Sequence, residues 1–162
     1  MNDRRMVIFD CDGVLVDGEP VSVRVLVAAL NRHGIDMAEE EAYTRFLGRS
    51  LATMRQVMDE EYGFHTGPEF LDAMLVDRDE RFRSELQAIS GIADTVYKLG
   101  CDHCGASSSQ PERIRLSLSL TGLLDKFEPH IFSASMVENG KPAPDLFLHA
   151  AQKMGYEPSS CI

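Results

Sequence analysis

Two aspartates separated by one residue, Asp10 and Asp12, directly follow the short apolar run 6–9. Carboxylates at positions i and i+2 of an extended segment can point to the same side, where their mutual repulsion favours a bound cation. One of them could attack phosphorus to form an aspartyl-phosphate, while the other protonates the leaving oxygen and then activates water. Similar patterns occur in turns and calcium loops, although the apolar residues 14–16 disfavour a calcium loop.

Two later segments contain groups that could hold a phosphate. The serine run 107–109 follows a weak strand candidate at 101–106, and its hydroxyl and N–H groups could bind phosphate oxygens. A serine-rich turn that caps the next helix is the alternative interpretation. Lys141 lies in a loop stiffened by two prolines, so its ammonium could clamp a phosphate and offset the aspartate charges, or could simply be exposed.

Cys101 and Cys104 have the spacing of a metal or redox pair. A zinc site would need a second pair with similar spacing, which the sequence lacks. A thioredoxin-like site would place the pair at a helix start, whereas Cys104 leads into a turn rich in serine. We therefore expect reduced cysteines near a buried strand.

The elements that must position these residues alternate between strand and helix, apart from one long helical stretch. The run 6–9 predicts a short buried strand, and residues 19–86 predict helices with no convincing strand. The later segments predict helices at 92–99, 112–120 and 144–154 and strands at 101–106 and 131–132. This order predicts an α/β fold with a parallel sheet, in which ligands bind at the carboxyl ends of the strands.

Composition excludes several classes of partner. The chain has 162 residues, which suit one domain with a modest insertion, and a formal net charge of −10, which disfavours nucleic acid. It contains no run of about 18 apolar residues that would span a membrane. The apolar run of four near the start is too short for a signal peptide, so we expect a cytoplasmic protein.

Three segments, in this order, resemble the first three motifs of the haloacid dehalogenase (HAD) superfamily. They are Phe-Asp-Cys-Asp-Gly-Val-Leu-Val-Asp at 9–17, Ala-Ser-Ser-Ser at 106–109 and Gly-Lys-Pro-Ala-Pro-Asp at 140–145. The connecting residues 121–124, Phe127 and 131–133 are also similar. The sequence resembles the branch of phosphatases and β-phosphoglucomutase-like enzymes that carry a helical cap after the first motif.

The resemblance implies a Rossmann-like core formed by residues 1–17 and 87–162, with a helical cap at 18–86 that excludes water during the first step. It also implies a magnesium-dependent mechanism. Asp10 would be the nucleophile and a metal ligand, and Asp12 would be the general acid and base, with its backbone carbonyl on the metal. The groups implied to hold the phosphoryl oxygens are the side chains of Ser107 and Lys141 and the backbone N–H groups of Cys11 and Ser108.

The resemblance also bears on the substrate. Mutases of this branch carry a histidine in the first cap helix, where this sequence reads Glu-Pro-Val-Ser at 19–22, which favours hydrolysis. Gly48, Arg45 and Arg49 lie where the cap usually contacts the rest of the substrate. The arginines could bind a second anionic group or could merely be exposed. We expect a monomer that acts on a small phosphorylated metabolite, such as a sugar or sugar-acid phosphate.

The family's fourth motif, an acidic pair that completes the magnesium site, has no counterpart in these 162 residues. The sequence therefore suggests a chain that is incomplete at its C-terminus and hydrolyses phosphate esters poorly or not at all. The alternatives are a β-phosphoglucomutase-like phosphotransferase and an inactive remnant domain. A true dehalogenase is disfavoured, because those enzymes lack the second aspartate of the pair.

Overall fold

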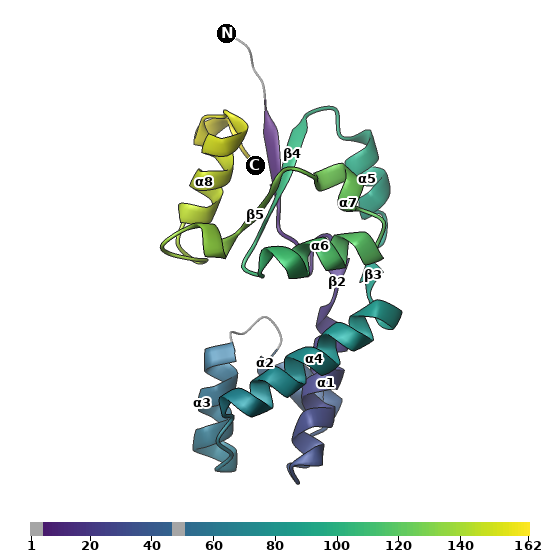
Figure 1. Ribbon diagram of the computed structural model, residues 1–162, viewed down its shortest axis with the longest axis vertical. Helices are drawn as coiled ribbons and strands as arrows, with labels where there is room; N and C mark the ends of the chain where they lie inside the picture. The colour runs from purple at the N-terminus through teal and green to yellow at the C-terminus, as the bar shows by residue number, and fades with distance from the viewer. Residues whose placement is uncertain (1–4, 47–50) are drawn as a thin grey trace. The chain divides into compact units, whose positions relative to one another are not determined.

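The computed structural model describes residues 5–46 and 51–162, without the side chains of residues 51 and 52. The chain folds into two compact units (Figure 1). Met1–Asp17 and Leu86–Ile162 form the first unit, and Gly18–Glu85 forms the second. The first unit is therefore built from two stretches of chain that the second unit separates in the sequence.

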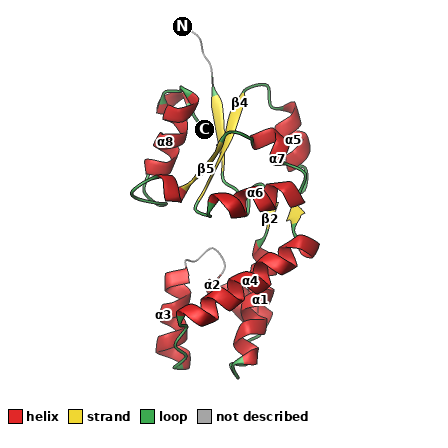
Figure 2. Ribbon diagram, viewed as in Figure 1, coloured by secondary structure: helices red, strands yellow, loops and turns green. Residues whose placement is uncertain are grey.

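Three parallel strands form the main sheet of the first unit, in the order β1-β4-β5 (Figure 2). They are β1 (Met6–Phe9), β4 (Asp102–Ser107) and β5 (Ile131–Ser133). Phe9 lies beside Gly105, and Ser107 lies beside Ser133. Because the strands are parallel, the residues that follow β1, β4 and β5 emerge at the same edge of the sheet. The predicted α/β class with a parallel sheet is confirmed.

Strand β1 pairs through its backbone on both sides. Opposite β4, Met6 forms a parallel bridge with Cys161. The N–H of Ile8 donates to the carbonyl of Ile162 at 2.8 Å, and the N–H of Ile162 donates to the carbonyl of Met6 at 2.9 Å. This central position explains the unbroken apolar run, since such runs are typical of strands buried within parallel sheets.

Helices flank this sheet, with α8 on one side and α5, α6 and α7 on the other (Figure 1). Their bounds are Ile92–Lys98 for α5, Pro111–Leu120 for α6, Leu124–Phe127 for α7 and Asp145–Met154 for α8, with short 3₁₀ turns at Ala134–Met136 and Pro158–Ser160. Pro111 suits the first position of α6, where an N–H would have no helical partner. Gly155 ends α8 in the left-handed conformation, with φ of 75°. The predicted helices are confirmed to within two residues, while α7 was not predicted.

The sheet and α8 share one apolar core. Leu146 and Ala150, four residues apart on α8, are fully buried against Cys104 and Ala106 of β4. This packing fixes the position of α8 and of the loop that precedes it. Because Lys141 lies in this loop, the packing of the core also determines the backbone position of Lys141.

A second, two-stranded sheet joins the two stretches of the first unit. Strand β2 (Val16–Asp17) pairs antiparallel with β3 (Gln87–Ala88). The sequence did not predict either strand, because two residues are too few to show a periodic pattern. The pairing holds together the points where the chain leaves the first unit and returns to it.

The second unit consists of helices, as predicted. They are α1 (Glu19–Arg32), α2 (Glu39–Phe46), α3 (Leu51–Tyr62) and α4 (Pro68–Glu85). Helix α1 packs against α2 and α4, with Val23, Val27 and Leu30 buried at helical spacing. An ion pair of 2.6 Å between Arg24 and Glu85 also joins α1 to α4. Among the described residues, no helix combines the length and apolar character needed to cross a membrane.

Candidate active site

Six polar residues from separate parts of the first unit gather at the carboxyl ends of β1 and β4. We call this group the aspartate cluster: Asp10, Asp12, Ser107, Ser109, Arg113 and Lys141. Four of the six were predicted to belong to the site. The structure brings them together with Ser109, which the sequence had singled out only as part of the serine run 107–109, and with Arg113, to which the sequence had given no role.

Asp10 directly follows β1 and is held through one carboxylate oxygen. Its Oδ1 accepts a hydrogen bond from the N–H of Cys11 at 2.7 Å, and Lys141 Nζ lies 2.9 Å from the same atom. Lys141 also donates to the carbonyl of Ala106 at 3.0 Å, so this one ammonium joins the ends of β1 and β4. The side chain of Asp10 is 42% exposed and that of Lys141 is 20% exposed, so this carboxylate remains accessible.

A tight loop follows Asp10 and fixes the backbone position of Asp12. The N–H groups of Leu15 and Val16 both donate to the carbonyl of Cys11, and Gly13 adopts the left-handed conformation with φ of 78°. Burial, with a further contribution from the charge of Asp12, raises the pKa of the Cys11 thiol to about 12. The thiol is therefore protonated at neutral pH, and Cys11 serves the site through its backbone.

Both carboxylate oxygens of Asp12 have side-chain partners. Its Oδ2 accepts a hydrogen bond from Ser109 Oγ at 3.0 Å, and its Oδ1 accepts one from Arg113 Nη2 at 3.0 Å. Arg113 lies in the first turn of α6, where a cation interacts unfavourably with the helix dipole. That unusual placement is the signal from which sequence reasoning could have inferred an acidic partner.

Hydrogen bonds order the serine run 107–109, and its three side chains differ in how far they are exposed. Ser107 Oγ accepts the N–H of Ser109 at 3.1 Å, and the carbonyl of Ser109 accepts a hydrogen bond from Ser133 Oγ at 2.7 Å. Ser107 and Ser133 are buried, whereas Ser108 is exposed. The run therefore forms a fixed turn between β4 and α6 rather than a loose linker.

The oxygen atoms at this site are the type of ligand that Mg²⁺ prefers. Magnesium is usually held by one or two carboxylates together with water and phosphate oxygens, and the half-exposed carboxylate of Asp10 fits one such position. In the part of the chain that the structure describes, no group of three or more His, Cys, Asp or Glu side chains could hold a metal. The residues present thus fit part of a magnesium site.

The cysteine pair has no redox or metal partner in the same described residues. All four cysteines are free, and Cys104 is fully buried in β4. Burial, with a smaller contribution from Cys161, raises the pKa of the Cys104 thiol to about 12. Because the thiolate is the form that binds metals and attacks disulfides, Cys104 is unreactive near neutral pH.

Arg45 is the one predicted cap contact whose surroundings the structure describes, since Gly48 and Arg49 lie outside the described residues. Its Nη1 donates to Tyr62 Oη at 2.7 Å, and its guanidinium also forms ion pairs with Glu41 and Glu61. A substrate anion would compete with these carboxylates. Its role as a substrate contact stays a prediction.

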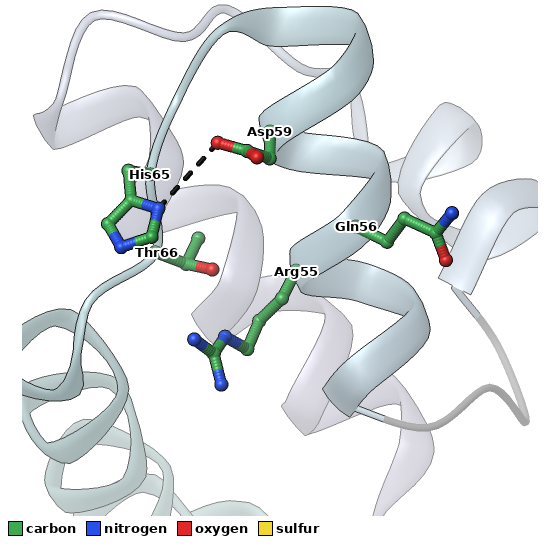
Figure 3. Close-up of a pocket in the computed structure, with 5 residues that line it drawn as sticks. All are labelled: Arg55, Gln56, Asp59, His65 and Thr66. Atoms are coloured by element: carbon green, nitrogen blue, oxygen red, sulfur yellow. Dashed lines mark ion pairs between the residues drawn. The ribbon is translucent and has the colours of Figure 1, made fainter.

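The second unit also contains an open pocket of about 220 Å³, which we call the helical-unit pocket (Figure 3). Arg55, Gln56, Asp59, His65 and Thr66 line it. His65 Nδ1 lies 3.6 Å from Asp59 Oδ1, which is an ion pair only when the imidazole is protonated. Gln56 points away from the His65–Asp59 pair in this view. The pocket's polar groups are therefore not directed at one common point.

Comparison with known proteins places this arrangement in a family. The model of the haloacid dehalogenase-like hydrolases matches residues 5–162. The 6-phosphogluconate phosphatase of Escherichia coli (strain K12) is 31% identical over 159 residues, which cover 96% of this chain and 71% of that protein. A conserved haloacid dehalogenase-like protein of unknown function from Agrobacterium tumefaciens superimposes with a TM-score of 0.86 at 31% identity, covering 98% of this chain and 72% of that one. A family hydrolase from Deinococcus radiodurans with bound phosphate and sodium gives a TM-score of 0.80 at 30% identity, covering 99% and 72%.

Proposed function

Because the chain belongs to the haloacid dehalogenase-like hydrolase family, we propose that it hydrolyses a small phosphomonoester through an aspartyl-phosphate on Asp10. The observation that carries this proposal is the contact of 2.9 Å between Lys141 and Asp10 at the open end of β1. A nucleophilic carboxylate and a cation that can hold the transferring group are thereby joined at one point. Asp12, two residues further on, supplies the acid and base.

The first step transfers the phosphoryl group to Asp10. Both contacts described for this carboxylate are to Oδ1, so Oδ2 is the atom that would attack phosphorus. As the bond between Oδ2 and phosphorus forms, the ester P–O bond breaks, and Asp12 gives its proton to the leaving oxygen. The substrate alcohol departs, and Asp12 is left as a carboxylate.

The second step releases phosphate. Asp12, now ionised, removes a proton from a water molecule as the water oxygen attacks phosphorus. The bond between phosphorus and Asp10 breaks, which restores the free carboxylate and yields inorganic phosphate. Asp12 regains its proton in this step, so both aspartates end the cycle as they began it.

Two side chains of the aspartate cluster retain donors for the phosphoryl oxygens. An ammonium has three N–H donors, and Lys141 directs one toward Asp10 and one to the carbonyl of Ala106, which leaves a third. Ser107 Oγ accepts the N–H of Ser109, so its own hydroxyl hydrogen is available to donate. The N–H of Cys11 is directed at Asp10 and would be shared with a bound phosphoryl group, and the exposed Ser108 offers another backbone N–H.

Mg²⁺ would be held by the carboxylate of Asp10 and the backbone carbonyl of Asp12, where it would reduce the repulsion between an incoming phosphate and the two aspartates. The chain's own contribution is the tight turn after β1, in which the N–H groups of Leu15 and Val16 donate to the carbonyl of Cys11, between the two aspartates. Lys141, in contact with Asp10 at 2.9 Å, contributes to the same neutralisation.

We propose a sugar phosphate or sugar-acid phosphate as the substrate. The similarity to a 6-phosphogluconate phosphatase supports this class, and Arg45 and Arg49 are the candidate contacts for its second anionic group. Residues 19–22 contain no histidine of the kind expected in a mutase, which favours water over a second sugar as the acceptor.

The proposal is tested by measuring phosphate release from 6-phosphogluconate, a hexose phosphate and p-nitrophenyl phosphate, with and without Mg²⁺. We expect magnesium-dependent release at a low rate, because the described residues fit only part of a magnesium site, and a preference for the sugar-acid phosphate over the hexose phosphate. Asp10→Asn should abolish release, and Asp94→Asn is its matched control, because Asp94 is an exposed carboxylate on α5. Release that is absent with every phosphomonoester would favour an inactive domain instead.

A further inference from the structure

We propose that Arg113 is a positioning residue that holds the Asp12 carboxyl group where it can pass its proton to the leaving oxygen. The inference rests on the proposed function, because it assumes that Asp12 acts as the general acid. Its physical basis is the contact of 3.0 Å between Arg113 Nη2 and Asp12 Oδ1. The Arg113 side chain is only 17% exposed, so water competes weakly for this contact.

Two partners on opposite oxygens orient the carboxylate. Ser109 donates to Oδ2 of Asp12 while Arg113 donates to Oδ1, so both the position and the rotation of the carboxylate are restrained. Either partner alone would leave the carboxylate able to swing about the remaining hydrogen bond. Proton transfer requires the acid within hydrogen-bond reach of the leaving oxygen, which makes such restraint useful.

The serine partner is itself anchored, which makes it a suitable reference point for Asp12. The N–H of Ser109 donates to Ser107 Oγ, and its carbonyl accepts from the fully buried Ser133 Oγ at 2.7 Å. Ser133 is also hydrogen-bonded to Ser135 at 2.9 Å. The general acid is thus connected to the ends of β4 and β5.

The neighbouring arginine on α6 shows that the location of Arg113 is specific. Arg115 pairs with Glu128 at 2.6 Å, and its side chain is 44% exposed. Exposed ion pairs of this kind typically contribute little to stability. Arg113, in the first turn of the same helix, occupies an electrostatically unfavourable position, and pairing with Asp12 offsets that cost.

The test compares substrates whose leaving groups need a proton to different degrees. The sugar of a sugar phosphate would leave as an alkoxide, which is a strong base and needs protonation. The leaving group of p-nitrophenyl phosphate is p-nitrophenolate, which is stable without a proton. We expect Arg113→Ala to lower kcat/KM about 100-fold for the sugar phosphate but only about fivefold for the aryl phosphate, since general acid catalysis typically contributes 100-fold or more.

Two matched variants separate positioning from general damage to the fold. Arg113→Lys should recover part of the lost rate for the sugar phosphate, because an ammonium keeps the charge but loses the fork geometry of the guanidinium. Arg115→Ala should leave both substrates unaffected. Equal losses for the two substrates in Arg113→Ala would overturn the proposal, because damage to the whole site lowers both rates together.

A crystal structure of Arg113→Ala, or of Arg113→Lys should the alanine variant not fold, tests the same claim without activity. We expect the Asp12 carboxylate to leave its present place while the Asp10–Lys141 contact is kept. An unchanged Asp12 would refute the positioning role. If Asp12 moves and neither substrate is hydrolysed by the unaltered chain, the proposed function fails while Arg113 still positions Asp12.

Discussion

The aspartate cluster and the helical-unit pocket both combine acidic and basic side chains, but they differ in how those side chains are held. In the cluster, Lys141 is bound by Asp10 and by a backbone carbonyl, and Asp12 has a partner on each oxygen. In the pocket, His65 is 78% exposed and Asp59 is 65% exposed, with 3.6 Å between them. The cluster is therefore ordered before any ligand arrives, whereas the pocket's charges are solvated.

The difference shows why one region supports a chemical proposal and the other does not. Charged groups stabilise a transition state most effectively when they are fixed in advance and partly shielded from water. A carboxylate and an imidazole on an exposed surface are screened by solvent and contribute little. Composition alone would not separate the two regions, because each contains at least one carboxylate and at least one basic side chain.

Removing Lys141, one of the two cations of the aspartate cluster, should have the largest effect. Lys141→Ala deletes the group that joins Asp10 to the end of β4, and we expect kcat to fall about 100-fold to 1,000-fold, as for other electrostatic contacts to a transition state. Phosphate release with saturating substrate measures this. Lys153→Ala, on the exposed side of α8, is the control and should retain full activity. A kcat within twofold of the original would mean that Lys141 has no part in the reaction.

A smaller effect is expected at Ser133, which reaches Asp12 through Ser109. Ser133→Ala removes the donor to the Ser109 carbonyl, and the free energy of unfolding should fall by about 1 kcal/mol, the usual net value of one hydrogen bond. Because Ser109 then holds Asp12 less firmly, kcat should fall severalfold. Urea unfolding and phosphate release measure the two changes. Unchanged stability together with unchanged kcat would show that this hydrogen bond does not support the site.

The smallest effect is expected in the helical-unit pocket. His65→Ala should leave stability within about 0.5 kcal/mol and phosphate release unchanged, because surface substitutions away from special features are nearly neutral. Asp59→Asn should behave in the same way. A marked loss of activity with intact folding in either variant would contradict our distinction between the two regions.

The sequence predicted the framework of the site better than its internal contacts. The apolar run before Asp10 predicted β1, and the parallel order of the strands predicted that ligands bind at their carboxyl ends. These inferences succeed because burial and strand direction leave a clear pattern along the chain. The resemblance to the HAD superfamily, not the strand order, implied that Asp10, Ser107 and Lys141 act together there.

The contacts of Asp12 were not predicted, because they join residues far apart in the sequence. Arg113 lies 101 positions from Asp12, and the only local sign of its role is a cation in the first turn of α6. The sequence also could not tell which hydroxyl of the serine run would turn toward Asp12, since that depends on the turn between β4 and α6. The structure assigns this contact to Ser109.

The central claim is that Asp10 carries the phosphoryl group, and trapping that group tests it most directly. The chain would be mixed with excess 6-phosphogluconate and Mg²⁺, quenched in acid within the first turnover and digested for mass spectrometry. Our account predicts one phosphoryl group on the peptide that contains Asp10, and none on the same peptide from Asp10→Asn. Phosphate release with the phosphoryl group on another residue, or at an undiminished rate in Asp10→Asn, would contradict it.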